Sequence, residues 1–327
     1  MFNQTDIFYL CIDKIYEMNL QQLEYIVAID QHRHFAKAAE SCFVTQATLS
    51  MMVKKLEEEL GLLLFDRSKQ PVCPTDAGKE IIQQARIVLR ESSAIKEISN
   101  GIKKEVKGEL RMGIIPTLAP YLLPLFLNNF LKKYPEVHLN LFEISTAEIV
   151  SHLEKDLIDI GILATPLHLE AYTEEPLFYE PFEVFVSKKE NKLNKQFLLP
   201  KDLDINRLWL LEEGHCLRTQ MLNLCELQKQ DLGRQLNYEA GSIESLLRIV
   251  EVNQGITIVP KLATLDFNAS RKKQLRQFSN PVPVREISMV SYRQYARRNL
   301  SEVLKKEIIQ SVEGKLETPQ KTKVIAI

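Results

Sequence analysis

The sequence predicts an α/β protein that begins with a winged helix-turn-helix, continues through a long helix and ends in two α/β lobes. The N-terminal part has short helical patterns, a tight connection and a hairpin pattern. A heptad-like repeat follows, and from Glu109 onward strand-like and helix-like segments alternate. The 327 residues are enough for two or three domains, and 45% hydrophobic with 26% charged residues is ordinary for a soluble globular protein.

Composition excludes several classes of protein. The net charge of −1 does not by itself indicate a nucleic-acid or membrane partner. The five cysteines are odd in number and scattered, which excludes the disulfide framework of a small secreted domain. No cysteine or histidine spacing suggests zinc, so we expect no metal and no cofactor. The apolar run at 7–12 is too short for a signal peptide or membrane span, which favours a cytoplasmic, reducing location.

The N-terminal elements follow from caps and breakers. A fresh pattern opens at Met18, so 1–17, with Cys11, is expected to be an extension. Asn19 and Thr45 can cap the first and third helices of a domain at 18–75, and Gly61 can end the third. A second helix is expected at 35–42, and a hairpin with a basic tip at 62–73. These elements together predict a winged helix-turn-helix.

A linker helix is expected at 76–107, capped by Thr75. Apolar and small residues recur along it at alternating spacings of four and three, which is typical of a dimerising heptad seam. The alternative is a helix that lies on its own domain. The seam consists of Ile81, Ala85, Val88, Ser92, Ile95, Ser99 and Ile102.

The regulatory part is expected at 108–312. Strand, helix, strand, helix and strand follow one another up to 163, an order that predicts a parallel sheet flanked by helices. After Pro200 the theme repeats, which favours two lobes joined by a crossing segment. The C-terminal residues 313–327 are polar and expected to fray. The expected strands are at 110–115, 137–142, 158–163, 177–186, 208–211, 256–259 and 287–292, and the expected helices at 121–134, 147–155, 218–230, 243–252 and 300–309.

Two cysteines, Cys216 and Cys225, lie nine positions apart. His215 precedes the first and Arg218 follows it by two residues, and positive charge near a thiol favours the reactive thiolate. A second thiol close in the chain could trap an oxidised first thiol as a disulfide. The alternative is that both are small apolar core residues, as expected for the remaining cysteines Cys42 and Cys73.

The third helix of the N-terminal domain offers side chains suited to DNA. Short polar groups at its start reach base edges or phosphates in a major groove, and basic groups nearby can hold phosphates. Thr45 could instead serve only as a cap, and the lysines could form a solvated face. The polar group consists of Thr45, Gln46, Thr48 and Ser50, and the basic group of Lys54, Lys55, Arg67 and Lys69.

Longer motifs give a resemblance that spacing alone does not. FAKAAESCFVTQATLS at 35–50, LEEELGLLLFDR at 56–67, TDAG at 75–78 and GITIVP at 255–260 resemble LysR-type transcriptional regulators over about 18–310. The resemblance implies a winged helix-turn-helix, a linker helix and a two-lobed domain like periplasmic binding proteins. It also implies a homotetramer built as a dimer of dimers, promoter DNA and RNA polymerase as partners, and no enzymatic activity.

Within that family, GIIPTLAPYLLP at 113–124 and EGHCLR at 213–218 resemble the peroxide-sensing members. That resemblance implies that peroxide oxidises Cys216, that Cys225 resolves it as a disulfide, and that a thioredoxin- or glutaredoxin-type reductant resets it. The implied peroxide pocket contains Thr117, Thr146, His215, Arg218 and Arg285. Two alternatives remain: a LysR-type regulator that binds a small metabolite between its lobes, and a thiol peroxidase.

Overall fold

A computed structural model of the 327-residue chain describes residues 18–102, 106–190, 197–203, 207–225, 240–292, 298–316 and 321–327. The expected extension at 1–17, with Cys11, lies outside these residues. The chain divides into two compact units between Ile98 and Ser99. The first unit has one hydrophobic core and the second has two.

The first unit opens with the predicted helices. α2 (Leu20–His32) begins at Asn19, whose side chain and Gln22 form a reciprocal capping box. α3 (Phe35–Ser41) follows. α4 (Gln46–Leu60) is capped by Thr45 and ends at Gly61, which has a φ of 68° that favours glycine. Their buried faces meet in a core that includes Leu23, Ile26, Ile29, Leu49, Val53 and Leu56.

The wing is a short antiparallel pair, β1 (Phe65–Asp66) and β2 (Cys73–Pro74). A buried carboxylate anchors it, because Glu57 Oε1 on α4 accepts from the Leu64 amide at 2.9 Å. α5 (Asp76–Ile102) then packs closely against this corner. A Cβ on Gly78 would lie 2.0 Å from the Leu64 carbonyl oxygen, so only glycine fits the TDAG motif here.

The seam along α5 divides into two stretches. Ala85 is 2% exposed and packs in the core of its own domain, with Ile81 partly buried beside it, so the alternative interpretation holds for the start of the helix. Further along, Val88 is 37% and Ile95 70% exposed, which leaves this stretch available to a partner. The side chains of Ser99 and Ile102 lie outside the described set.

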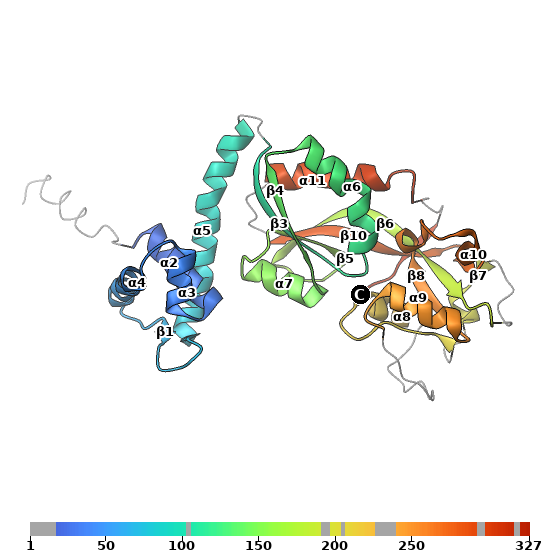
Figure 1. The fold of residues 1–327 in the computed structure, drawn as a ribbon, viewed down its shortest axis with the longest axis horizontal. Helices are drawn as coiled ribbons and strands as arrows, with labels where there is room; N and C mark the ends of the chain where they lie inside the picture. Colours follow the sequence, from blue (N-terminus) through green and yellow to red (C-terminus); the bar gives the residue numbers. More distant parts are fainter. Residues whose placement is uncertain are drawn as a thin grey trace, which may run out of the picture. The chain divides into compact units, whose positions relative to one another are not determined.

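The first lobe of the second unit has the predicted parallel arrangement. The chain order is β3 (Gly108–Ile114), α6 (Ala119–Lys133), β4 (Val137–Glu143), α7 (Thr146–Glu154) and β5 (Ile160–Thr165). The spatial order is β4-β3-β5, with both pairs parallel. α11 (Arg298–Val312) packs beside α6 in the same core (Figure 1).

Two long antiparallel strands cross from one lobe to the other, as predicted. β6 (Tyr172–Val186) pairs with β10 (Val282–Tyr292) along its first part. Its last residues pair with strands of the second lobe. That lobe contains β7 (Phe197–Leu198), η1 (Pro200–Asp202), α8 (Cys216–Leu224), α9 (Ile243–Val252), β8 (Ile256–Pro260), η3 (Lys261–Thr264), α10 (Ala269–Lys272) and β9 (Leu275–Phe278).

Two predictions about this unit were wrong. The strand expected at 208–211 is reduced to isolated bridges at Leu208 and Leu211. The helix expected near 218–230 is present as α8, which begins at Cys216, and the expected end lies outside the described residues. The C-terminal segment does not fray over 321–327: β11 (Thr322–Val324) pairs with β10, and Ile325 is only 4% exposed in the second-lobe core. Ile325 supplies the burial that the polar stretch before it lacks, whereas Val324 and Ala326 remain exposed.

Candidate redox site and nucleic-acid interface

Cys216 is the first residue of α8 and follows the N-cap residue His215. Its side chain is 5% exposed and belongs to the hydrophobic core of the first lobe. Among the described residues, Cys42, Cys73, Cys216 and Cys225 are all free thiols. Cys42 and Cys73 are half-buried, whereas the sequence led us to expect buried thiols.

Arg285 on β10 is fully buried near this thiol and is held on several sides. Its Nε donates to Glu180 Oε2 at 2.8 Å, and Glu180 lies directly opposite it on β6. Its Nη1 donates to Thr117 Oγ1 and its Nη2 to the Thr117 carbonyl oxygen, each at 3.2 Å. The predicted pocket residues Thr117 and Arg285 are therefore in direct contact.

The surroundings of Cys216 act on its thiol in opposing directions. Burial raises the pKa of Cys216 and is the largest effect. The Arg285 charge is the strongest influence that lowers this pKa, followed by Thr146 and the backbone amides at the start of α8. The result is a thiol whose pKa is raised, although groups that favour the thiolate surround it.

The Thr146 hydroxyl has an unusual position. It is the first residue of α7, and its Oγ1 is buried without a hydrogen-bond partner of regular geometry. Its proximity to the sulfur still lowers the Cys216 pKa. A buried hydroxyl without such a partner costs free energy, and groups of this kind often have a redox or catalytic role or bind an ordered water or ion.

His215 and Arg218 both contact the loop that enters α8. His215 Nε2 lies 3.6 Å from Glu212 Oε1, and Arg218 Nη1 donates to the Leu211 carbonyl oxygen at 2.5 Å. The chief cation acting on Cys216 is therefore Arg285 from β10, and not the sequence neighbours that first suggested an activated thiol.

Cys225 lies at the other end of the same helix, as the C-cap of α8, and not on a following helical segment as expected. It is half-buried against the second-lobe core, and burial raises its pKa to about 11. Nine residues of α-helix separate two Cα atoms by about 13 Å. A disulfide requires Cα atoms within about 7 Å, so α8 must unwind before these sulfurs can bond.

The C-terminal segment holds this helix in place. Gln220, fully buried in the middle of α8, donates from Nε2 to the Ile325 carbonyl oxygen at 3.0 Å. Asn223 donates from Nδ2 to the Ala326 carbonyl oxygen at 3.1 Å. Unwinding α8 would therefore disturb the contacts of the last residues of the chain.

Glu180 is the residue of this site that sequence reasoning missed. It is fully buried and carries the carboxylate that binds Arg285. The available signal was its position inside an otherwise apolar strand pattern, since a carboxylate there needs a buried partner. The partner is 105 positions away in the chain, so the pattern alone could not identify it.

At the start of α4, Thr45, Gln46 and Thr48 are exposed and Ser50 is half-buried. Thr45 Oγ1 accepts from the Thr48 amide at 3.1 Å and contacts Thr48 Oγ1 at 2.9 Å. Thr45 therefore caps α4, which is the role that the sequence offered as the alternative to contact with DNA. The Gln46 side chain is exposed to solvent. Phe43, in the tight turn before this helix, is 96% exposed and was not anticipated as an interface residue.

The basic residues of this domain lie close to acidic ones. Lys54 lies 3.5 Å from Glu58, and Lys69 lies 3.4 Å from Asp66. Arg67 Nη2 lies 2.7 Å from the buried Glu57, which gives it a structural role in fixing the wing. Lys55 is exposed on α4. Exposed pairs of this kind exchange readily with water and other anions, so the two lysines remain available to phosphates.

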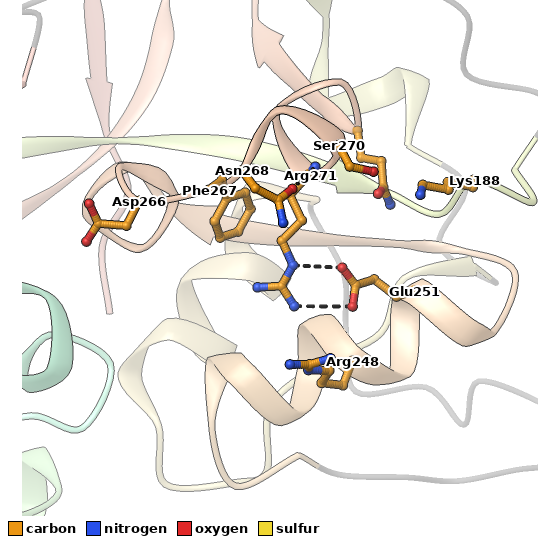
Figure 2. A pocket seen from close by; sticks show the side chains of 9 residues that line it. Lys188, Arg248, Glu251, Asp266, Phe267, Asn268, Ser270 and Arg271 are labelled. Atoms are coloured by element: carbon orange, nitrogen blue, oxygen red, sulfur yellow. Dashed lines mark hydrogen bonds and ion pairs between the residues drawn. The ribbon is translucent and has the colours of Figure 1, made fainter.

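A separate pocket of about 470 Å³ lies in the second lobe around α9 and α10 (Figure 2). The Arg271 guanidinium crosses it and binds Glu251 through Nε at 2.7 Å and Nη2 at 3.2 Å. None of the residues implied by the peroxide-sensing resemblance lines it. Its lining consists of Lys188, Arg248, Glu251, Asp266, Phe267, Asn268, Ser270, Arg271 and Gln274.

The described residues contain neither a clustered set of metal ligands nor a membrane-spanning helix. No group of three or more histidine, cysteine or acidic side chains in this part of the chain is arranged to hold a metal ion. None of the helices described is both long and apolar enough to cross a membrane.

A winged helix-turn-helix joined to a two-lobed α/β domain defines a DNA-binding regulator with an effector domain. The sequence profile described as "Bacterial regulatory helix-turn-helix protein, lysR family" matches residues 20–79, and that described as "LysR substrate binding domain" matches residues 103–312. The chain therefore belongs to the LysR family of transcriptional regulators.

Several relatives share most of the chain. A "Hydrogen peroxide-inducible genes activator" from Pectobacterium carotovorum is 35% identical over 93% of this chain and all of its own. The "DNA-binding transcriptional dual regulator OxyR" of Escherichia coli K12 is 38% identical over 75% of this chain and 80% of its own. A solved full-length OxyR variant from Pseudomonas aeruginosa matches with a TM-score of 0.76 at 33% identity, over 90% of this chain and 98% of that one.

Proposed function

We propose that this chain is a peroxide-responsive transcriptional regulator in which Cys216 is the oxidised residue and Cys225 resolves it. The Cys216 thiolate attacks one oxygen of hydrogen peroxide, the O–O bond breaks, and the departing hydroxide is protonated to water. Cys216 becomes a sulfenic acid. The Cys225 sulfur then attacks the oxidised sulfur, a second water leaves and a disulfide forms.

One observation carries the proposal: the buried Cys216 thiol lies among the Arg285 guanidinium, the buried Thr146 hydroxyl and the amides that open α8. A hydroxyl in this position can donate to or accept from a peroxide oxygen. A cation and helix N–H groups favour the thiolate that attacks. The names of the relatives, which denote peroxide-inducible activators, support the same chemistry.

The conformational part of the proposal follows from α8. Because the two sulfurs occupy opposite ends of one helix, the disulfide can form only after α8 unwinds. Unwinding changes the packing of both lobes, because Cys216 belongs to one core and Cys225 contacts the other. We propose that this change alters the arrangement of DNA-binding domains in a dimer of dimers.

The partners follow from the same proposal. Promoter DNA contacts Thr45, Gln46, Thr48 and Ser50, with phosphates held by Lys54, Lys55, Arg67 and Lys69. RNA polymerase is the partner through which activation occurs. A thioredoxin- or glutaredoxin-type dithiol returns the disulfide to the thiols, which requires a reducing, cytoplasmic setting.

The test is peptide mapping by mass spectrometry, after thiol blocking, of the protein before and after one equivalent of hydrogen peroxide. The expected product is a disulfide between the peptides that contain Cys216 and Cys225, with the other cysteines still blocked. Two free thiols after treatment would overturn the redox proposal and favour the regulator that binds a metabolite. Catalytic consumption of many equivalents of peroxide with a thiol reductant would instead favour a peroxidase.

A further inference from the structure

The buried ion pair between Arg285 and Glu180 links three elements of the sensing site. Glu180 Oε2 accepts from Arg285 Nε and Oε1 accepts from the Leu262 amide at 2.7 Å, so one carboxylate bridges β6, β10 and η3. Both side chains of the pair have no exposed surface. The Nη1 and Nη2 atoms of the guanidinium also donate to Thr117.

We propose that Glu180 is a positioning residue of the sensing site: it fixes the Arg285 guanidinium beside Cys216 and offsets its charge, and so restrains the reactivity of the sulfur toward oxidants. This inference rests on the proposed function, in which Cys216 is the reactive residue, and it gives Glu180 control over the reactivity of that residue. A lone buried guanidinium would stabilise a nearby thiolate strongly, whereas a guanidinium paired with a carboxylate does so weakly.

The geometry gives Glu180 two separable effects. The first is orientation, because the carboxylate occupies one edge of the guanidinium and leaves Nη1 for Thr117. The second is electrostatic, because the Glu180 carboxylate is bonded directly to the cation that lowers the Cys216 pKa. A negative charge in contact with the guanidinium weakens its attraction for a thiolate, and burial, the largest influence on this pKa, acts in the same direction.

Other ionisable groups near the pair are already satisfied or uncharged. Burial raises the pKa of Tyr121 on α6 far above neutrality, so its phenol stays protonated. Beyond it, Glu244 on α9 lies 3.5 Å from Arg271. Glu286 follows Arg285 on β10 but accepts from Thr165 and Tyr179. His215, next to Cys216, lies beside Glu212. Glu180 is thus the carboxylate in direct contact with Arg285 among the contacts described.

The test is the pH dependence of Cys216 alkylation by iodoacetamide in the reduced full-length protein, which reports thiolate without any peroxide. Glu180→Gln keeps the size of the side chain and removes its charge. We expect the profile to move to lower pH by about one unit, which makes alkylation near pH 7 about tenfold faster. An unmoved profile, or one displaced to higher pH, would overturn the inference.

Two further variants separate this effect from general damage. Glu183→Gln removes another buried carboxylate from β6, one that binds Lys261 and Thr264, and should leave the profile unchanged. Glu180→Asp keeps the charge and should restore most of the wild-type profile. If Glu180→Gln does not fold, the test rests on Glu180→Asp, which keeps the charge. A pH profile of alkylation like that of wild type then supports the inference. A profile displaced by the full unit expected for loss of the charge overturns it. Failure of wild-type protein to form the disulfide with peroxide would overturn the proposed function instead.

Discussion

The chemistry of single residues sets how this protein would respond to oxidants. Cys216 has a raised pKa, so only a small fraction is thiolate near neutral pH. Its reaction with peroxide therefore becomes faster as pH rises toward that pKa. Burial raises the pKa of Cys225 to about 11, so this thiol is a poor nucleophile until α8 opens. The two thiols are consequently prepared for sequential steps.

The cysteine variants should behave differently under mild peroxide. Cys216→Ser should remain unmodified and fail to induce target promoters, because it lacks the buried thiol that reacts first. Cys225→Ser should still react but stop at a sulfenic acid or mixed disulfide. Peptide mapping and a promoter assay measure both outcomes, and Cys73→Ser serves as the control. Peroxide-dependent activation by Cys216→Ser would show that another residue senses the oxidant.

A second prediction at this scale concerns DNA reading. Gln46→Ala should lose discrimination between operator and scrambled DNA, because the exposed amide lies at the start of α4. A lost base contact costs roughly 1–3 kcal/mol. Titrations by gel shift on both DNAs measure the difference. Lys54→Ala is the matched comparison and should weaken binding to both DNAs alike. Equal discrimination by Gln46→Ala and wild type would remove Gln46 from the interface.

Among the elements, α8 is the one that must unwind before the proposed disulfide can form. Gln220→Ala removes the buried hydrogen bond to the Ile325 carbonyl oxygen, which contributes roughly 1 kcal/mol or more. The variant should be less stable in urea and should form the Cys216–Cys225 disulfide several times faster after oxidation. Thr219→Ala, at an exposed position of the same helix, should have the opposite effect because alanine favours helix. Identical rates in both variants would exclude unwinding of α8 as the slow step.

Helix α5 carries the assembly prediction. Val88→Glu places a charge in the exposed part of the seam and should weaken dimerisation, since a seam position buries its side chain in a coiled coil. Light scattering at low micromolar concentration should then give a lower mass than for wild type. Gln83→Glu, on the outer face of the same heptad, should leave the mass unchanged. A Val88→Glu protein of wild-type mass would place the interface elsewhere.

Elements with local signals were predictable, and elements that depend on distant partners were not. α2, α4 and α9 follow their caps and apolar periodicity closely, because the determining residues lie within one turn. β11 escaped prediction because three residues form a strand only when β10 accepts them. The two cysteines of the proposed redox pair were singled out from the sequence, whereas Arg285, the cation that acts on Cys216, was suggested only by family resemblance.

At the scale of the whole molecule, the two compact units have separate cores. The first core contains residues between Leu23 and Leu89, and the two cores of the second unit contain residues from Val106 onward. Each unit therefore has the apolar interior that independent folding needs. A solved OxyR from Porphyromonas gingivalis is matched over its whole length by 67% of this chain, at 32% identity and a TM-score of 0.61.

A fragment of residues 106–327 should therefore fold and form the Cys216–Cys225 disulfide with wild-type kinetics, yet bind no operator. Circular dichroism, peptide mapping after peroxide and a gel shift measure the three properties. The full-length protein treated in parallel is the control. A fragment that is unfolded, or that oxidises much more slowly, would mean that the N-terminal unit contributes to the sensing site.

The position of both sulfurs on one helix also adds a time requirement. Under the proposed function, oxidation of Cys216 would need only an encounter with peroxide, but the disulfide would have to wait for α8 to unwind. During that interval two equivalents of a cellular thiol would return the sulfenic acid to the thiol: the first forms a mixed disulfide and water, and the second releases Cys216. For a switch built on this pair, the sulfenic acid formed during a brief pulse of oxidant would be reduced again before the disulfide forms. A sustained exposure would lead to the disulfide. The length of α8 and its attachment to the C-terminal strand would then set how long an exposure must last before it counts as a signal.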